Sequence, residues 1–201
     1  MTLRCGRITW EISYPLAGLM AAILILDTSM NVWLCFIAVL MHEGGHLAML
    51  YHCHTPPKHI RLSLFDIAII DRQPYRHTTK QALTIALAGI TVNFITALIC
   101  FLLWHCTGWA WLPTFITAHL TLGFFNAMPV AALDGGQVLL LLLSCRFAPV
   151  TAERILTVIS VICLLPMACL GFYLLLLTRY NFTLLLAALY LIALLLLRQK
   201  T

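Results

Sequence analysis

The sequence predicts an all-α polytopic membrane protein with about six transmembrane helices, the fourth of them broken, and a small membrane-associated β-hairpin between the second and third. The first basis is composition: of the 201 residues, 62% are hydrophobic and 9% are charged, and the mean hydropathy is +0.98. A soluble domain has about a quarter of its residues charged. The second basis is a series of apolar runs long enough to cross a bilayer, and the third is one polar connection with strand-like alternation.

Six apolar runs define the expected helices, because a span needs about 20 predominantly apolar residues. The runs lie near 12–28, 31–53, 80–105, 109–145, 155–177 and 181–197. The first follows Arg4 and Arg7, as a signal sequence would, but no small-residue cleavage site comes after it. We therefore expect it to remain as a span.

The fourth run is too long for one crossing. As an unbroken helix its 37 residues would extend about 55 Å, against a hydrocarbon core of about 30 Å. Proline interrupts a helix and a glycine pair relaxes the backbone, so we expect a break between Asn126 and Gly136, a segment that contains Pro129.

The basic residues indicate the topology, because cytoplasmic loops carry an excess of Lys and Arg. If the fourth run makes one net crossing, eleven Lys and Arg lie on one side and only Arg179 lies on the other. Two crossings would reduce this contrast to eight against four. We therefore expect six spans with both termini cytoplasmic. Since no run of five basic residues accompanies the net charge of +5, a nucleic-acid partner is not expected.

The polar connection 54–79 is the place of the expected hairpin. Residues 60–64 alternate apolar and polar side chains, which is typical of a half-buried strand. β-branched residues follow, and Asp71-Arg-Gln-Pro74 then predicts a turn. This cytoplasmic hairpin is expected to lie at the membrane face, where its edge could bind an extended peptide.

A metal-binding pattern lies inside the second run, in the sequence His42-Glu43-Gly44-Gly45-His46. Positions i and i+4 share one helix face, so both imidazoles can bind one Zn²⁺. Glu43, beside them, can take a proton from a bound water. This H-E-x-x-H pattern predicts one catalytic zinc per chain.

Asp134 is the expected third ligand, since a catalytic zinc usually has three protein ligands and one open position. Apart from Glu43 it is the one acidic residue well inside an apolar run. The other acids flank a run, begin one or lie in the hairpin: Glu11, Asp27, Asp66, Asp71 and Glu153. The alternative for Asp134 is a pairing with Asn93 or with a backbone amide.

Three further polar residues in apolar surroundings each leave two alternatives open. Asn93 and Asn126 offer a donor and an acceptor together, so either could hold an extended substrate or an oxyanion. Each could instead form a hydrogen bond between two helices. His119 could approach the zinc face or could also bond between helices. The eight cysteines include no C-x-x-C pair and are interpreted as small apolar residues.

Together these residues resemble the site-2 protease family of intramembrane zinc metalloproteases, especially its compact bacterial branch that includes the sporulation proteases. His42-Glu-Gly-Gly-His46 resembles the H-E-x-x-H of that family. Asn126-Ala-Met-Pro129 with Leu133-Asp134-Gly-Gly136 is similar to its N-x-x-P…L-D-G-G element. Gly89 with Asn93 is similar to its G-x-x-x-N, without the proline that often follows the glycine.

The resemblance implies roles for these residues. His42, His46 and Asp134 would bind zinc, Glu43 would be the catalytic base, and a second group would contact substrate. That substrate-binding group consists of Asn126, Asn93, Pro129 and Gly135. The catalytic core would cover about 30–145, within a single domain 1–201 whose accessory spans are 12–28, 155–177 and 181–197.

The resemblance also implies a function. The protein would hydrolyse a peptide bond in or near a transmembrane segment of another protein, in a bacterial cytoplasmic membrane, with or without a membrane regulatory partner. The alternatives are a membrane zinc or proton transporter, in which no bond is broken, and an inactive relative that only binds helices. Glu43 distinguishes the protease from the transporter, because only a protease needs it as a base.

Overall fold

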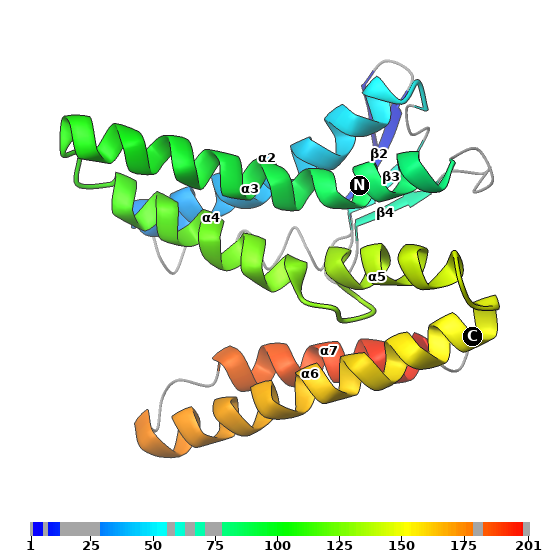
Figure 1. Ribbon diagram of the computed structural model, residues 1–201. Coiled ribbons are helices and arrows are strands. Elements are labelled where there is room, and N and C mark those ends of the chain that lie inside the picture. The colour runs from blue at the N-terminus through cyan, green and yellow to red at the C-terminus, as the bar shows by residue number, and fades with distance from the viewer. Residues whose placement is uncertain are drawn as a thin grey trace. The chain divides into compact units, whose positions relative to one another are not determined.

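The computed structural model describes residues 2–5, 8–12, 29–55, 59–62, 67–70, 78–178 and 183–198. The chain forms two compact units, Met1–Leu122 and Gly123–Thr201, and the boundary between them falls inside helix α4. Figure 1 shows the elements of both units. The expected first span, 12–28, lies outside the described residues except for its first residue, which ends a strand.

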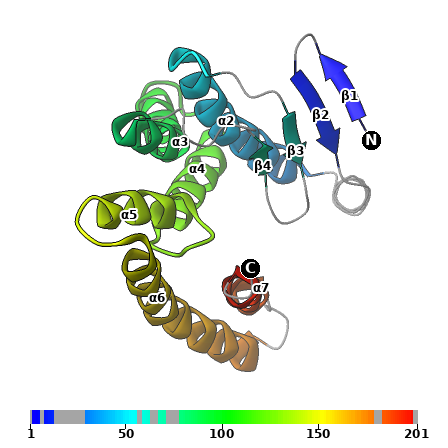
Figure 2. The ribbon, with the colours of Figure 1, turned by 90° about the vertical axis from the view of Figure 1, so that its right-hand side faces the viewer.

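A four-stranded sheet belongs to the first unit. Its strands are β1 (Thr2–Cys5), β2 (Ile8–Ile12), β3 (His59–Leu62) and β4 (Ile67–Ile70). They follow one another in the order β1-β2-β3-β4, as Figure 2 shows. The outer pairs are antiparallel, whereas β2 and β3 are parallel.

The antiparallel pair β3–β4 lies in the connection where strands were expected. Strands β1 and β2 were not expected from the sequence. Each has only four or five residues, and β2 finds its second neighbour in β3, about fifty residues further along the chain. Such a pairing depends on long-range partners, so a local pattern of residues does not predict it.

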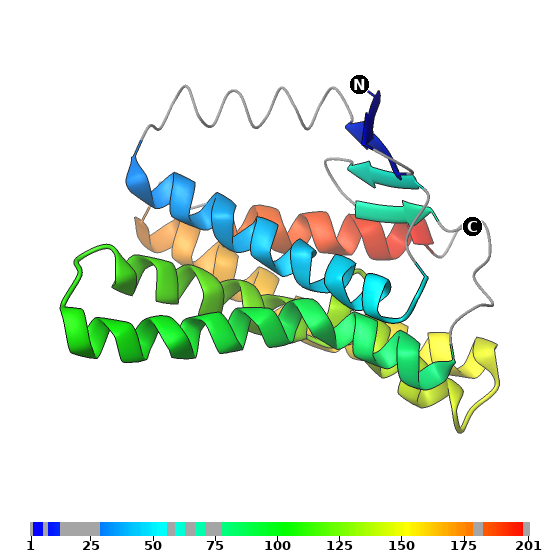
Figure 3. The ribbon, with the colours of Figure 1, turned by 90° about the horizontal axis from the view of Figure 1, so that it is seen from above.

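Three helices complete the first unit: α2 (Met30–His52), α3 (Thr79–Thr107) and the first part of α4 (Leu112–Ala127). Figure 3 shows α2 and α3 side by side, and they pack together along their lengths. A small buried core joins the three helices. It consists of Leu34 and Ala38 from α2, Cys100 from α3, and Leu112 and Phe115 from α4.

Both ends of α3 are fixed by local hydrogen bonds. At its start, the Thr78 hydroxyl accepts from the Gln81 backbone N–H, and the Gln81 side chain accepts from the Thr78 N–H, which forms a capping box. At its end, Gly108 has a left-handed φ of 69° and donates its N–H to the Trp104 carbonyl. These caps set the limits of the helix.

The second unit contains the end of α4 and three further helices, α5 (Asp134–Ser144), α6 (Pro149–Thr178) and α7 (Thr183–Arg198). Helices α6 and α7 pack side by side (Figure 1). Gly171 of α6 lies so close to the backbone of Leu185 that a Cβ there would be 2.6 Å from its nitrogen. The core residues of this unit are Val130, Ala131, Leu133, Leu156, Leu164, Leu191 and Leu195.

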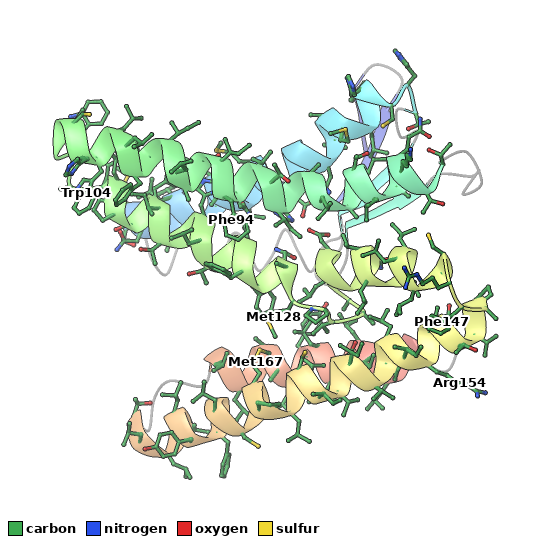
Figure 4. All side chains as sticks on the ribbon, viewed as in Figure 1. Phe94, Trp104, Met128, Phe147, Arg154 and Met167 are labelled. Atoms are coloured by element: carbon green, nitrogen blue, oxygen red, sulfur yellow. The ribbon has the colours of Figure 1, made fainter. Side chains whose placement is uncertain are left out.

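The fourth apolar run is interrupted where the sequence predicts a break. Helix α4 ends at Ala127, and α5 begins at Asp134. Pro129 lies in the connection between them, and Met128, labelled in Figure 4, begins that connection. The break divides the run into two helices that are each too short to count as a full span.

Three described helices are long and apolar enough to cross a membrane: α2, α3 and α6. Helix α5 and residues 184–196 of α7 are apolar but shorter. Large apolar side chains on these helices are widely exposed, among them Leu102 (57%), Ile162 (63%) and Leu177 (67%). A surface of this kind suits lipid and not water. The molecule is therefore a multi-pass membrane protein.

Candidate metal centre

Helix α2 presents His42 and His46 on its buried face. The two residues are one helical turn apart, and their side chains are only 4% and 9% exposed. Their Nε2 atoms lie 3.3 Å apart, and the rings meet edge to face with centroids 4.9 Å apart. The pair that the sequence predicts is therefore formed. Glu43, the next residue after His42, is half-buried on the same helix.

The distance between the two imidazole nitrogens fits a zinc ion. Nitrogen ligands at 2.0–2.1 Å from a tetrahedral Zn²⁺ lie about 3.3 to 3.4 Å from each other. The Nε2 atoms of His42 and His46 have this separation, at 3.3 Å, without further movement. Neutral imidazole is also a preferred ligand for zinc.

A carbonyl of α3 orients the His46 ring. Its Nδ1 lies 2.8 Å from the Ile85 carbonyl oxygen, which can only accept a hydrogen bond. Nδ1 must therefore carry the proton, and the lone pair of the neutral ring is then on Nε2. Zinc-binding histidines commonly donate their second N–H in this way, which fixes both tautomer and ring orientation.

His42 is held by a chain of polar side chains that reaches into α4. The Asn93 amide nitrogen lies 2.9 Å from His42 Nδ1, and the Asn93 amide oxygen lies 3.0 Å from His119 Nδ1. Asn93 and His119 are both 0% exposed. His119 is thus hydrogen-bonded between helices, one of its two expected alternatives. Both ends of the Asn93 amide are occupied, which favours its helix-bonding alternative over contact with substrate.

Two glycines allow α2 and α3 to approach closely around the histidines. A Cβ on Gly89 would overlap His46 Nε2 and would lie 2.7 Å from His42 Cε1. A Cβ on Gly45 would lie 2.8 Å from the Val92 side chain and 3.0 Å from the Ala88 carbonyl. Gly44, by contrast, faces open space. Gly89 and Gly45 therefore set the distance between the helices, and Gly44 does not.

The second unit holds the other predicted site residues on the short segment 126–135, which joins the end of α4 to the start of α5 and is called the elbow below. Asn126 lies in the last turn of α4, Pro129 lies in the connection, and Asp134 and Gly135 open α5. All four are half-buried. A Cβ on Gly135 would collide with the backbone carbonyls of residues 127 and 128, so the glycine is required for the elbow to close.

Ser160 on α6 fixes this elbow and was not singled out by its sequence. Its hydroxyl accepts from the Ala131 N–H at 2.9 Å and donates to the Leu156 carbonyl at 2.7 Å. The side chain is 0% exposed. Serine in an apolar helix often bonds only to its own backbone, so a local pattern of residues does not predict this second contact.

Comparisons with known proteins find similarity to zinc metalloproteases. The model of peptidase family M50 matches residues 103–167, which include the elbow but not His42 and His46. A zinc metalloprotease of Methanocaldococcus jannaschii is 29% identical over 129 residues. That alignment covers 61% of this chain and 37% of the relative, so the chain spans little more than a third of that relative's length.

The fold itself is that of a solved structure. The site-2 protease from Methanocaldococcus jannaschii matches with a TM-score of 0.63 and 24% sequence identity. The match covers 95% of this chain and 91% of that structure.

Proposed function

We propose that the chain is a member of peptidase family M50 and that it is an intramembrane zinc metalloprotease. It hydrolyses a peptide bond in or near a transmembrane segment of another membrane protein. One observation carries this proposal: His42 and His46 bring their Nε2 atoms to 3.3 Å on a helix that is apolar enough to cross the bilayer. An acidic residue, Glu43, stands beside this pair.

The proposed ligands of one Zn²⁺ per chain are His42, His46 and Asp134. Two neutral imidazoles and a carboxylate form a donor set that zinc accepts, and it leaves a fourth position open. When bound, zinc polarises a carbonyl and lowers the pKa of water towards 7. Support for Asp134 comes from its donor chemistry and from its place at the start of α5, directly after the N-x-x-P element.

Glu43 is the proposed general base. It takes a proton from the attacking water and then passes it to the amine of the departing fragment. The substrate helix must first unwind, because a helical peptide keeps its carbonyl oxygens in hydrogen bonds within the helix.

Residues of the elbow are proposed to hold the unwound segment. Asn126 can donate and accept together, and Pro129 and Gly135 shape the backbone beside it. The main-chain groups of an outer strand offer a second contact by strand addition, and β4 is one end of the sheet order. Asn93 is assigned to the orientation of His42, because both ends of its amide are already bonded.

The proposed topology has six spans, a hairpin at the membrane face, and both termini in the cytoplasm of a bacterial cell. Residues 1–201 are proposed to form one protease domain. The charge distribution supports it, because no Lys or Arg occurs between Lys80 and Arg146. The last turn of α3 and the loop before α4 instead carry Trp104, Trp109 and Trp111, which are 40 to 53% exposed. Aromatic residues of this kind are typical of a membrane–water interface.

Co-expression tests the proposal. Candidate anchored membrane proteins, including those with a membrane regulatory partner, are expressed with the wild type, with Glu43→Gln and with Asp134→Asn. We expect processing only with the wild type. Equal processing by the wild type and both variants would refute the protease assignment. Zinc or proton movement that persists in the Glu43→Gln variant, without any cleavage by the wild type, would instead favour a transporter.

A further inference from the structure

The elbow that leads to Asp134 shares a buried apolar core with the two C-terminal helices. Val130, Ala131 and Leu133 of the elbow are all buried, and Leu133 directly precedes Asp134. They form one cluster with two leucines of α6 and two of α7, namely Leu156, Leu164, Leu191 and Leu195. The residues immediately before the proposed third ligand therefore pack in a core that α6 and α7 complete.

A single polar group interrupts the apolar face that α6 contributes to this core. Leu156, Ser160 and Leu164 follow one another at intervals of four residues, so they share one face of the helix, and all three are buried. Met128 of the elbow and Met167 of α6, both labelled in Figure 4, pack against the same cluster. The Ser160 hydroxyl is thus a polar atom in apolar surroundings, where a hydrogen bond is stronger than in water.

The directions of the two Ser160 hydrogen bonds follow from the backbone groups that make them. The Ala131 N–H can only donate, so the hydroxyl oxygen accepts from it at 2.9 Å. The Leu156 carbonyl can only accept, so the hydroxyl donates to it at 2.7 Å. The bond to Leu156, one turn earlier on α6, holds the hydroxyl in the orientation that meets Ala131.

The bond to Ser160 attaches a stiff segment to α6. Three other elbow N–H groups bond to carbonyls close by in the sequence, in the pairs Met128–Phe125, Val130–Met128 and Leu133–Val130. The start of α5 is also pressed against the elbow, since a Cβ on Gly136 would overlap the Val130 carbonyl oxygen. Because the segment is closed on itself in this way, a shift at Ala131 is expected to reach Asp134, three residues later.

We propose that α6 and α7 support the metal site, with Ser160 as a positioning residue for Asp134. Ser160 holds the backbone before Asp134 by one hydrogen bond, and the leucines of α6 and α7 hold it by packing. A ligand that is held before the ion arrives binds it more tightly than one that must first be ordered. The spans 155–177 and 181–197, expected only as accessory helices, thereby gain a role in metal binding. The inference rests on the proposed function, in which Asp134 is the third zinc ligand.

Two substitutions of Ser160 distinguish positioning from a purely structural role. Ser160→Ala removes the hydroxyl, whereas Ser160→Thr keeps it. If Ser160 positions Asp134, the folded Ser160→Ala variant should bind zinc about 10-fold more weakly, at the lower end of the effect of outer-shell partners of metal ligands, and Ser160→Thr should restore the affinity. If Ser160 only stabilises the fold, Ser160→Ala should unfold at a lower temperature but bind zinc as the wild type does while it is folded.

A matched pair of leucines on α7 provides a second test, which is independent of whether the Ser160 variants fold. Leu191 is buried in the cluster, whereas Leu189, two residues earlier, is 56% exposed. Leu191→Ala removes packing from the core that holds the elbow, so we expect it to weaken zinc binding. Leu189→Ala removes the same atoms from the surface and should leave zinc affinity unchanged.

The experiment uses the full chain in detergent, at a temperature where every variant is folded. Zinc affinity is measured by competition with a chelator, and the ligand geometry is measured from the visible absorption of the Co²⁺-loaded protein. Four-coordinate Co²⁺ absorbs visible light more strongly than six-coordinate Co²⁺, so this spectrum reports on the ligands and not on overall stability. Asp134→Asn supplies the reference spectrum for a disturbed third ligand.

We expect the wild type, Ser160→Thr and Leu189→Ala to share one intense spectrum. Ser160→Ala and Leu191→Ala should give weaker spectra that approach the spectrum of Asp134→Asn. Wild-type affinity and spectra in both Ser160→Ala and Leu191→Ala would overturn the inference and leave the proposed function standing. A wild type that binds neither Zn²⁺ nor Co²⁺, or an Asp134→Asn variant with the wild-type spectrum, would instead refute the metal site of the proposed function.

Discussion

Gly89 of α3 lies directly against the His46 imidazole of α2, so closely that a Cβ at position 89 would overlap the ring nitrogen Nε2. The same Cβ would lie 2.9 Å from His42 Nδ1, the atom that Asn93 contacts. Gly89 and Asn93 are four residues apart, so they share one helix face. The G-x-x-x-N spacing therefore places two features against the same pair of histidine rings. Gly89 leaves space for the rings, and the Asn93 amide contacts one of them.

Gly89→Ala should displace both imidazoles from their present positions. We expect zinc affinity to fall by at least tenfold, because metal sites require their ligands to keep a set geometry. Forcing a methyl group into a packed contact should also lower the free energy of unfolding, by about 1–3 kcal/mol. Zinc content after dialysis and thermal unfolding in detergent measure the two effects.

Gly44→Ala is the matched control for that substitution. Gly44 is exposed and a Cβ there would meet no atom within 4 Å. Alanine in a helix is favoured over glycine by about 0.5–1 kcal/mol, so this variant should retain zinc and unfold at the same or a higher temperature. Equal zinc loss in both variants would contradict the close approach at Gly89.

Ser160→Ala should weaken the elbow that precedes Asp134. The Ala131 N–H would lose its hydrogen bond to the Ser160 hydroxyl, and the net loss of one hydrogen bond costs about 0.5–1.5 kcal/mol. We expect a lower unfolding temperature together with reduced substrate cleavage. Ser144→Ala, at an exposed position in α5, should change neither property. A Ser160→Ala variant as stable as Ser144→Ala would show that the Ser160 bond does not support the elbow.

The histidine pair should account for the bound metal. His42→Ala and His46→Ala should each reduce zinc from about one ion per chain to a small fraction, because each removes one of the three ligands that a catalytic zinc usually has. His105→Ala alters an exposed histidine of α3 and should leave the zinc content unchanged. Elemental analysis of the three purified variants would test this, and unchanged zinc in all three would refute the assigned ligands.

Two native cysteines can test the topology. Cys106 ends α3 and Cys145 follows α5, and both are free and exposed. One net crossing of the fourth run puts them on opposite sides of the membrane. An impermeant thiol reagent applied to intact cells should therefore label Cys106 and spare Cys145, with Cys106→Ser and Cys145→Ser identifying each signal. Labelling of both from outside would favour two crossings.

The sequence predicts those parts of the site that depend on local spacing. The i, i+4 rule brings His42 and His46 to one face, and Pro129 with the following glycines interrupts the fourth apolar run. These features need no knowledge of any other segment. Three of the six expected spans correspond to helices long and apolar enough to cross a membrane, α2, α3 and α6, and composition alone predicts these.

Contacts between distant segments could not be predicted in this way. The sequence left two alternatives each for Asn93 and His119, because the partner of a polar side chain depends on how helices pack. No local pattern predicted the hydrogen bond between Ser160 and Ala131, which lie 29 residues apart. The pairing of β2 with β3 likewise joins two segments that no local pattern connects.

The central claim is that Glu43 acts as a base beside a zinc held by His42 and His46. The most direct measurement is cleavage of one identified membrane substrate by purified wild type and Glu43→Gln at equal zinc content. We predict that the variant retains about one zinc per chain and loses cleavage by at least a hundredfold, in keeping with the usual contribution of a general base. Cleavage by zinc-loaded Glu43→Gln at the wild-type rate would contradict the account.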